Sequence, residues 1–212
     1  MTNFIPIFPL NVVVYPGETL NLHIFEPRYK ELVKECFSGN KPFGVPAIIK
    51  GNVAEFGTLL TISEIAKEYD NGEMDIITNG TIVFRILEII KKIPDKLYSG
   101  AIVNYPENAE VYQRKDLLLA VVKAIRELHR ILNISKDFHK PDEELNAYDL
   151  AHHAGLSLEE EYELLGLFRE EQRQEYLKRH LGKVLPVVAE MEVLKERIML
   201  NGHFKNLSSF RF

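Results

Sequence analysis

The sequence is poor in the features from which disulfide-bonded and membrane-spanning proteins are built. Its 212 residues include one cysteine, Cys36, and no tryptophan. A single cysteine excludes an internal disulfide and is typical of a reducing compartment. The apolar runs, such as residues 12–15 and 117–122, are far shorter than the roughly 20 residues of a membrane-spanning helix. The N-terminal stretch MTNFIPIFPL lacks the basic and continuous apolar segments of a signal peptide, so we expect a cytoplasmic protein without a membrane partner.

Motifs for catalysis and for phosphate binding are also missing. The sequence contains no G-x-x-x-x-G-K-[ST], G-x-S-x-G, H-E-x-x-H or C-x-x-C. His152 and His153 are adjacent, and neighbouring residues on a helix point about 100° apart, so they cannot chelate one ion as histidines at i and i+4 do. We interpret them as a solvent-facing or partly packed pair. The sequence therefore predicts no catalytic residue, no metal and no cofactor.

Positive charge is not in excess. Lysine and arginine number 26 against 31 aspartates and glutamates, which gives a net charge of −5. Nucleic-acid binding usually depends on a basic surface, so this balance weighs against RNA as a ligand. Hydrophobic residues make up 46% and charged residues 27% of the chain, which is ordinary for a globular protein of one large or two small domains.

The first half of the chain follows the two-residue period of β-strands. Leucine and isoleucine alternate with polar residues over 19–24, and apolar residues alternate again over 82–86 after Asn79-Gly80, a dipeptide typical of hairpin turns. Six or seven short strands with glycine-containing turns indicate a small barrel or sandwich. Further strands are expected near residues 11–15, 43–49, 57–65, 73–78 and 98–104.

One helix is expected among these strands. Pro27 suits a first helical turn, because its ring fixes φ and its missing N–H would have no partner there. Gly39 is expected to end the helix. The apolar residues between them recur at helical spacing, and they include Cys36, which we interpret as a core residue and not as a nucleophile: Tyr29, Leu32, Val33 and Cys36.

Glu26 and Arg28 flank the start of this helix and are the candidate ligand-binding residues. Together they could grip a ligand. Alternatively, a glutamate beside a helix N-terminus and an arginine that ties down a neighbouring loop would serve the fold alone. The sequence leaves both roles open.

Beyond about residue 113 the apolar period changes to that of helices. One helix is predicted from a stripe at 118, 121, 125, 128 and 132, and a second from Pro141 to Gly155. A third is expected to begin at Ser157, which forms a capping box with Glu160. A last, long helix contains Pro186, where a kink is expected, and should end at Gly202. Its apolar stripe comprises Leu177, Leu181, Val184, Val188, Met191, Leu194 and Ile198.

The pattern predicts two domains, a β-domain over residues 1–108 and a helical domain over 109–212 that ends in an aromatic tail. The tail carries four apolar residues that would be exposed unless they pack on the body or on a partner: Phe204, Leu207, Phe210 and Phe212.

The stretch FPLNVVVYPGETLNLHIFEPRYKELV, residues 8–33, resembles the start of the substrate-binding domain found at the head of ATP-dependent Lon proteases and also as a free-standing protein. The resemblance continues through FGV at 43–45, FGT at 56–58, DNGEMDIITNGTIVFRI at 70–86 and YSGAIV at 98–103, and more weakly through LSLEEEYELL at 156–165. It implies an α+β fold, in which a small PUA-like β-barrel with one inserted helix precedes an α-helical bundle ending in a long kinked helix.

The resemblance also implies a function. It is that of a non-catalytic protein that holds peptide or unfolded-protein segments, as a recognition factor for a separate ATP-dependent protease or for a chaperone. The ATPase and Ser-Lys peptidase modules of Lon have no counterpart in this sequence, so enzymatic activity is not expected. RNA binding is the alternative, because PUA-like barrels elsewhere bind RNA.

Overall fold

Six antiparallel strands form a barrel in the first half of the chain. The computed structural model describes residues 2–108 and 114–207, with side chains up to residue 200. The sheet order is β1-β6-β5-β4-β3, and β2 pairs with the first half of β5. The strands are β1 (Thr2–Pro6), β2 (Thr19–Ile24), β3 (Phe43–Ile49), β4 (Asn52–Glu68), β5 (Met74–Ile90) and β6 (Gly100–Asn104).

The segment that follows β1 closes the barrel against β3. The Phe8 amide donates to the Gly44 carbonyl at 2.8 Å, and the Ile48 amide donates to the Leu10 carbonyl at 2.8 Å. These parallel bridges join the segment after β1, at one end of the strand order, to β3 at the other end. Most strands therefore have partners on both sides. The predicted barrel is confirmed, although residues 11–15 form no strand and instead pass through the core as a loop.

Asn79-Gly80 is not a hairpin turn, and this expectation was wrong. β5 runs through both residues as one strand. A Cβ atom on Gly80 would lie 2.5 Å from the Tyr15 carbonyl oxygen, so the glycine is required by the close approach of the segment before β2. The Gly80 amide donates to the Glu18 carbonyl at 2.8 Å, and the Gly80 carbonyl accepts from Gly17 at 2.9 Å.

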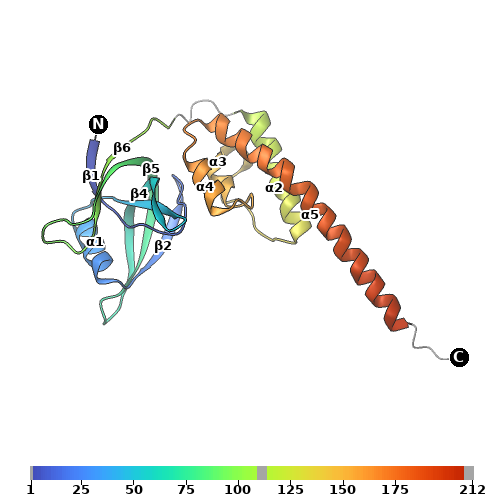
Figure 1. Ribbon diagram of the computed structural model, residues 1–212, viewed down its shortest axis with the longest axis horizontal. Coiled ribbons are helices and arrows are strands. Elements are labelled where there is room, and N and C mark those ends of the chain that lie inside the picture. Colours follow the sequence, from blue (N-terminus) through green and yellow to red (C-terminus); the bar gives the residue numbers. More distant parts are fainter. Residues whose placement is uncertain (1, 109–113, 208–212) are drawn as a thin grey trace.

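The inserted helix is confirmed. α1 spans Pro27–Ser38, Gly39 caps its end, and the four residues predicted to face the core are its buried residues. The remaining helices pack together beside the barrel (Figure 1), and the Ser157 capping box is present at the start of α4. They are α2 (Lys115–Leu132), the short η1 (Asp142–Glu144), α3 (Ala147–Ala151), α4 (Leu158–Leu165) and α5 (Glu170–Leu207).

Three helical boundaries or faces differ from the prediction. The second helix does not start at Pro141, because Asn146 caps α3 by accepting hydrogen bonds from the amides of Tyr148 and Asp149. Leu132 is exposed at the end of α2. α5 contains Pro186 as predicted, but it continues past Gly202. The side chains of the aromatic tail lie outside the described residues.

The barrel and the helices share one core. Val13, Tyr15 and Val83 from the barrel are buried together with residues of α2 to α5. The Tyr15 hydroxyl donates to the Glu161 carbonyl at 3.0 Å, and the Phe56 amide donates to the Tyr162 hydroxyl at 3.1 Å. We propose that residues 1–108 and residues 109–212 form two domains, with the boundary between β6 and α2.

We expect Ser157→Ala to lower the free energy of unfolding by about 1 kcal/mol, because the Glu160 amide loses its capping partner. Chemical denaturation measures the loss. Ser38→Ala is the matched control, since Ser38 lies exposed at the end of α1 and caps no helix start. An unchanged denaturation midpoint for Ser157→Ala would show that the cap contributes nothing.

Candidate substrate-binding surfaces

The two candidate residues of the sequence lie side by side at the start of α1 and bind each other. Arg28 Nε donates to Glu26 Oε2 at 2.8 Å, and the Arg28 guanidinium lies 4.5 Å from the centre of the Tyr29 ring. Both side chains are well exposed, and exposed pairs of this kind contribute roughly 0–1 kcal/mol. Arg28 therefore reaches its near neighbour and not a distant loop. A role of the pair in ligand binding stays a prediction.

A polar cluster that the sequence did not indicate lies at the end of β2. His23 Nδ1 is 2.7 Å from Asp75 Oδ1, and the Tyr69 hydroxyl donates to Asp75 Oδ2 at 2.7 Å. The hydrogen bond to Asp75 raises the pKa of His23, and the His23 ring stacks beside Phe25. The cluster ties the end of β2 to β5 and leaves the Phe25 ring exposed.

β2 itself is an edge strand. It pairs with β5 from Thr19 opposite Asn79 to Ile24 opposite Met74. Within the described residues no strand pairs with its other side, and no backbone hydrogen bond from outside the sheet reaches residues 19–24. Thr19, Asn21 and His23 are exposed. One row of backbone donors and acceptors is therefore open to an added strand.

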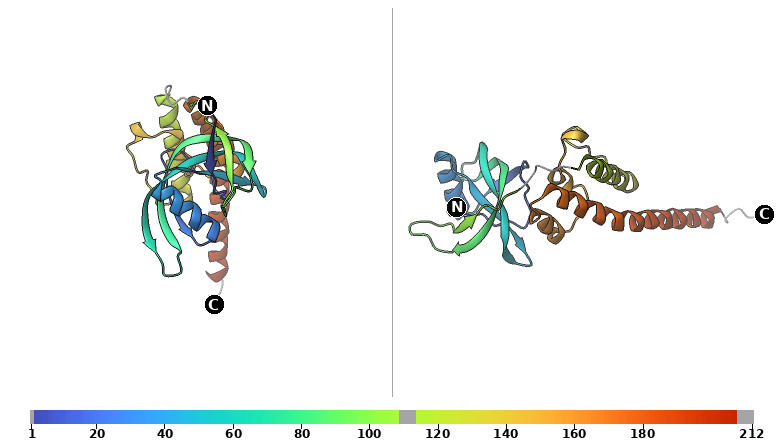
Figure 2. Two further views of the ribbon diagram at one scale, coloured as in Figure 1. Left: turned by 90° about the vertical axis from the view of Figure 1, so that its left-hand side faces the viewer. Right: turned by 90° about the horizontal axis from the view of Figure 1, so that it is seen from above.

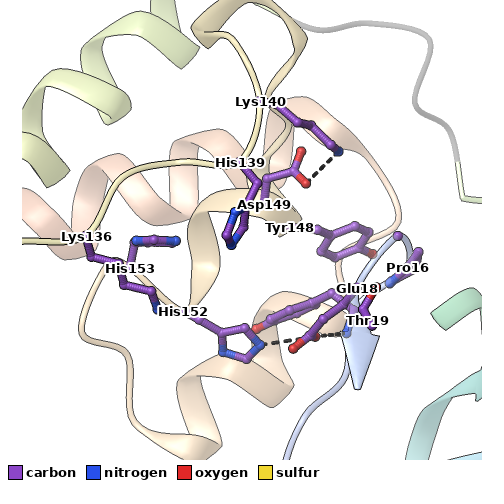
Figure 3. A pocket seen from close by; sticks show the side chains of 12 residues that line it. Pro16, Glu18, Thr19, Lys136, His139, Lys140, Tyr148, Asp149, His152 and His153 are labelled. Atoms are coloured by element: carbon purple, nitrogen blue, oxygen red, sulfur yellow. Dashed lines mark hydrogen bonds and ion pairs between the residues drawn. The ribbon is translucent and has the colours of Figure 1, made fainter. Parts of the chain in front are cut away.

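A cavity of about 500 Å³ lies between the barrel and the helices, where β2 begins (Figure 3). Residues 15–19 form one wall, and α3 with the segments on either side of it forms the other. Lys140 is paired with Asp149 at 2.7 Å. Lys136 and His139 also line the cavity, and neither has a hydrogen-bond or ion-pair partner in the described ranges 2–108 and 114–207. The cavity thus offers two basic side chains that are not engaged elsewhere in the described residues.

His152 joins the two walls of this cavity. Its Nδ1 lies 2.7 Å from Glu161 Oε1 and its Nε2 lies 3.2 Å from Glu18 Oε2. Burial alone would lower the pKa of His152, but the hydrogen bonds to Glu161 and Glu18 outweigh burial and raise the pKa to about 9. At neutral pH the ring is an imidazolium that links the barrel to α4.

His153 has the opposite environment. Its ring packs against His129 and meets Phe138 edge-on, and its Nδ1 is buried without a hydrogen-bond partner. Burial, and then the positive charge of Lys136, lower the pKa of His153 to about 4. The two histidines therefore point in different directions and hold different protonation states. Among the described residues, no three histidine, cysteine, aspartate or glutamate side chains are arranged to hold a metal ion.

A buried ion pair supports the helical wall of the cavity. The side chains of Glu170 and Arg173 are 3% and 1% exposed and lie 2.9 Å apart. Arg173 donates to the Tyr148 hydroxyl at 3.1 Å and to Asn108 Oδ1 at 2.7 Å, while Glu170 accepts from the Ala147 amide at 2.7 Å. The pair thus fixes α3 and the end of the barrel on α5. No sequence motif indicated it.

The apolar stripe of α5 is covered in its first half only. Leu177 and Leu181 are buried and Val188 packs against the same core, but the last turns of the helix project away from the rest of the chain (Figure 2). The last three residues of the predicted stripe, Met191, Leu194 and Ile198, are 56–66% exposed, and the neighbouring Val187 is 56% exposed. None of the described helices is both long and apolar enough to span a membrane.

Comparison with known proteins places this fold in a family. The model of the ATP-dependent protease La (LON) substrate-binding domain matches residues 5–183. The chain is similar to the crystal structure of a Lon N-terminal domain protein from Xanthomonas campestris, with 27% identity and a TM-score of 0.64 over 82% of this chain and 96% of that one. It shares the fold of the N-terminal domain of a Mycobacterium avium complex Lon protease, with 13% identity and a TM-score of 0.59 over 85% of this chain and 98% of that one.

The chain therefore belongs to the family of LON substrate-binding domains. Its antiparallel barrel, helical part and long last helix form the α+β fold that the sequence predicted. The family associates the chain with substrate binding in proteolysis. The matched domain is the substrate-binding domain, and no ATPase or protease domain is found in these 212 residues.

Proposed function

We propose that the protein binds extended segments of unfolded polypeptide and presents them to a separate protease or chaperone in the cytoplasm. The match to the substrate-binding family over residues 5–183 carries this proposal. The open edge of β2 beside the cavity supports it, because backbone groups along an edge strand pair with a peptide of almost any sequence. A recognition factor for proteolysis needs such tolerance.

The cavity adds selectivity to this edge. A peptide that extends β2 on its open side would pass the cavity at Thr19, where the unengaged Lys136 and His139 lie. Basic groups suit acidic side chains of the bound segment. Glu26 and Arg28 lie beyond the other end of β2, which ends at Ile24. We propose that they contact the far end of a longer segment.

We also propose that the protein is not an enzyme. Its one thiol, Cys36, is buried in α1, and burial raises the pKa of Cys36 to about 11. A thiol with this pKa is almost entirely protonated at neutral pH and is a poor nucleophile. The three histidines with shifted pKa values are engaged by carboxylates or packed among aromatic rings, so none of them is poised beside a nucleophile.

Titration of a labelled, permanently unfolded polypeptide and of a labelled single-stranded RNA at two salt concentrations tests the function. We expect micromolar binding of the polypeptide with little dependence on salt and no measurable binding of RNA. If RNA were the ligand, log K would fall by about 0.7 per neutralised phosphate with each unit of log salt. Tight, salt-dependent RNA binding without polypeptide binding would contradict the proposal.

Hydrogen exchange with bound polypeptide tests the site separately. The amides of residues 19–24 that point away from β5 should exchange at least roughly tenfold more slowly when the polypeptide is bound, because it supplies their missing acceptors. β6 is the internal control, since it is already paired with β1 and β5. Unchanged exchange in β2 at saturating polypeptide would place the site elsewhere while leaving the function intact.

A further inference from the structure

The outer half of α5 carries a second apolar stripe, offset at its start from the one predicted from the sequence, with the spacing of a helix–helix seam. Its members, Val187, Met191, Leu194 and Ile198, are separated by four, three and four residues, and all four are exposed. This alternation is the heptad spacing by which two helices pack along each other. α2 does not cover the stripe, because it packs on the side of α5 that carries Leu181 and Val188.

We propose that this stripe binds the same stripe of a second copy of the chain, with the two helices antiparallel. In that arrangement Met191 packs against the partner's Leu194, and Val187 packs against the partner's Ile198. Each of these contacts occurs twice, which gives four apolar layers along the seam. An antiparallel pair also places the barrels at opposite ends, because the barrel and helices α2 to α4 lie towards the end at which α5 begins (Figures 1 and 2).

The charges beside the stripe fit this occupant. Glu190 and Arg197 lie along one flank of the stripe, and neither has an ion-pair partner in the part of the chain that the structure describes. In the antiparallel pair each Glu190 faces the partner's Arg197, so both charges are compensated on both sides of the two-fold axis. In a parallel pair Glu190 would face the partner's Lys195, which Glu192 of its own helix already engages at 3.1 Å.

Sedimentation equilibrium of the whole chain tests the proposal. We expect a dimer that forms in the micromolar range, and Leu194→Gln or Met191→Gln should raise its dissociation constant at least roughly tenfold, because each substitution removes two apolar contacts. Leu200→Gln is the matched control, since Leu200 is equally exposed on the same helix but lies outside the stripe. The substituted side chains are exposed in the monomer, so the unfolding temperature should hardly change at concentrations well below the dissociation constant, where the chain is monomeric.

Charge exchange tests the orientation of the helices. Glu190→Arg should weaken the dimer several-fold, and adding Arg197→Glu should restore it. Restoration by Lys195→Glu instead would overturn the antiparallel arrangement. A chain that stays monomeric at about 100 μM, or a dimer that Leu200→Gln weakens as much as Leu194→Gln, would overturn the proposal as a whole. Polypeptide binding at β2 is measured separately and does not depend on this result.

Discussion

Replacing Arg173 by methionine should lower the free energy of unfolding by about 3–5 kcal/mol, because the substitution leaves a buried carboxylate without its partner. Glu170 is 3% exposed, so water cannot take over the role of the guanidinium. The Tyr148 hydroxyl and Asn108 Oδ1 also lose a donor. Denaturation by urea at neutral pH measures the loss.

Two further variants separate the missing charge partner from the loss of packing. Arg179→Met changes an exposed arginine of the same helix and should have little effect. Adding Glu170→Gln to Arg173→Met removes the unpaired charge but keeps an acceptor for the Ala147 amide, so it should recover part of the stability. If the double variant were as unstable as Arg173→Met, the buried charge would not be the cause.

Features that depend on neighbours along the chain were readable from the sequence. Pro27 and Gly39 bound α1 as predicted, and the four core-facing residues between them follow from helical spacing alone. The Ser157 cap is equally local, because its hydrogen-bond partner lies three residues away. Asn79-Gly80 shows the limit of this reasoning. The dipeptide favours a turn, but the structure uses Gly80 to admit the backbone of Tyr15, which is distant in sequence.

The candidate site depends mostly on contacts between residues that are far apart in the sequence. His152 meets Glu18 across 134 positions of sequence, and Arg173 meets Asn108 across 65, so no local pattern could pair them. The open side of β2 depends on which strands pair with which. The period of α5 indicated an apolar face correctly, but the period of a helix does not specify how much of that face the rest of the chain covers.

His152 and His153 lie at the junction of the barrel and the helices. Their contribution to the free energy of unfolding should be greatest near pH 6.5 and should fall at higher and at lower pH. The folded-state pKa of His152, about 9, exceeds the unfolded value of 6.5, so its contribution is complete below pH 6.5 and is lost as pH rises towards 9. The folded-state pKa of His153, about 4, is below 6.5, so its contribution is present above pH 6.5 and is lost as pH falls towards 4. Each contribution is about 1–2 kcal/mol, after a reduction for the partial access of water to the rings.

Single substitutions should remove the two effects separately. The free energy of unfolding of His152→Gln should approach that of the unchanged chain as pH rises from 6.5 to 9, because the unchanged chain loses its imidazolium link to Glu18 and Glu161 over that range. His153→Gln should instead reduce the loss of stability between pH 6.5 and 4, since glutamine takes up no proton when the chain unfolds. Urea denaturation across pH 4 to 9.5 measures both differences. Parallel curves for His152→Gln and the unchanged chain over the alkaline range would mean that the imidazolium does not hold the two walls together.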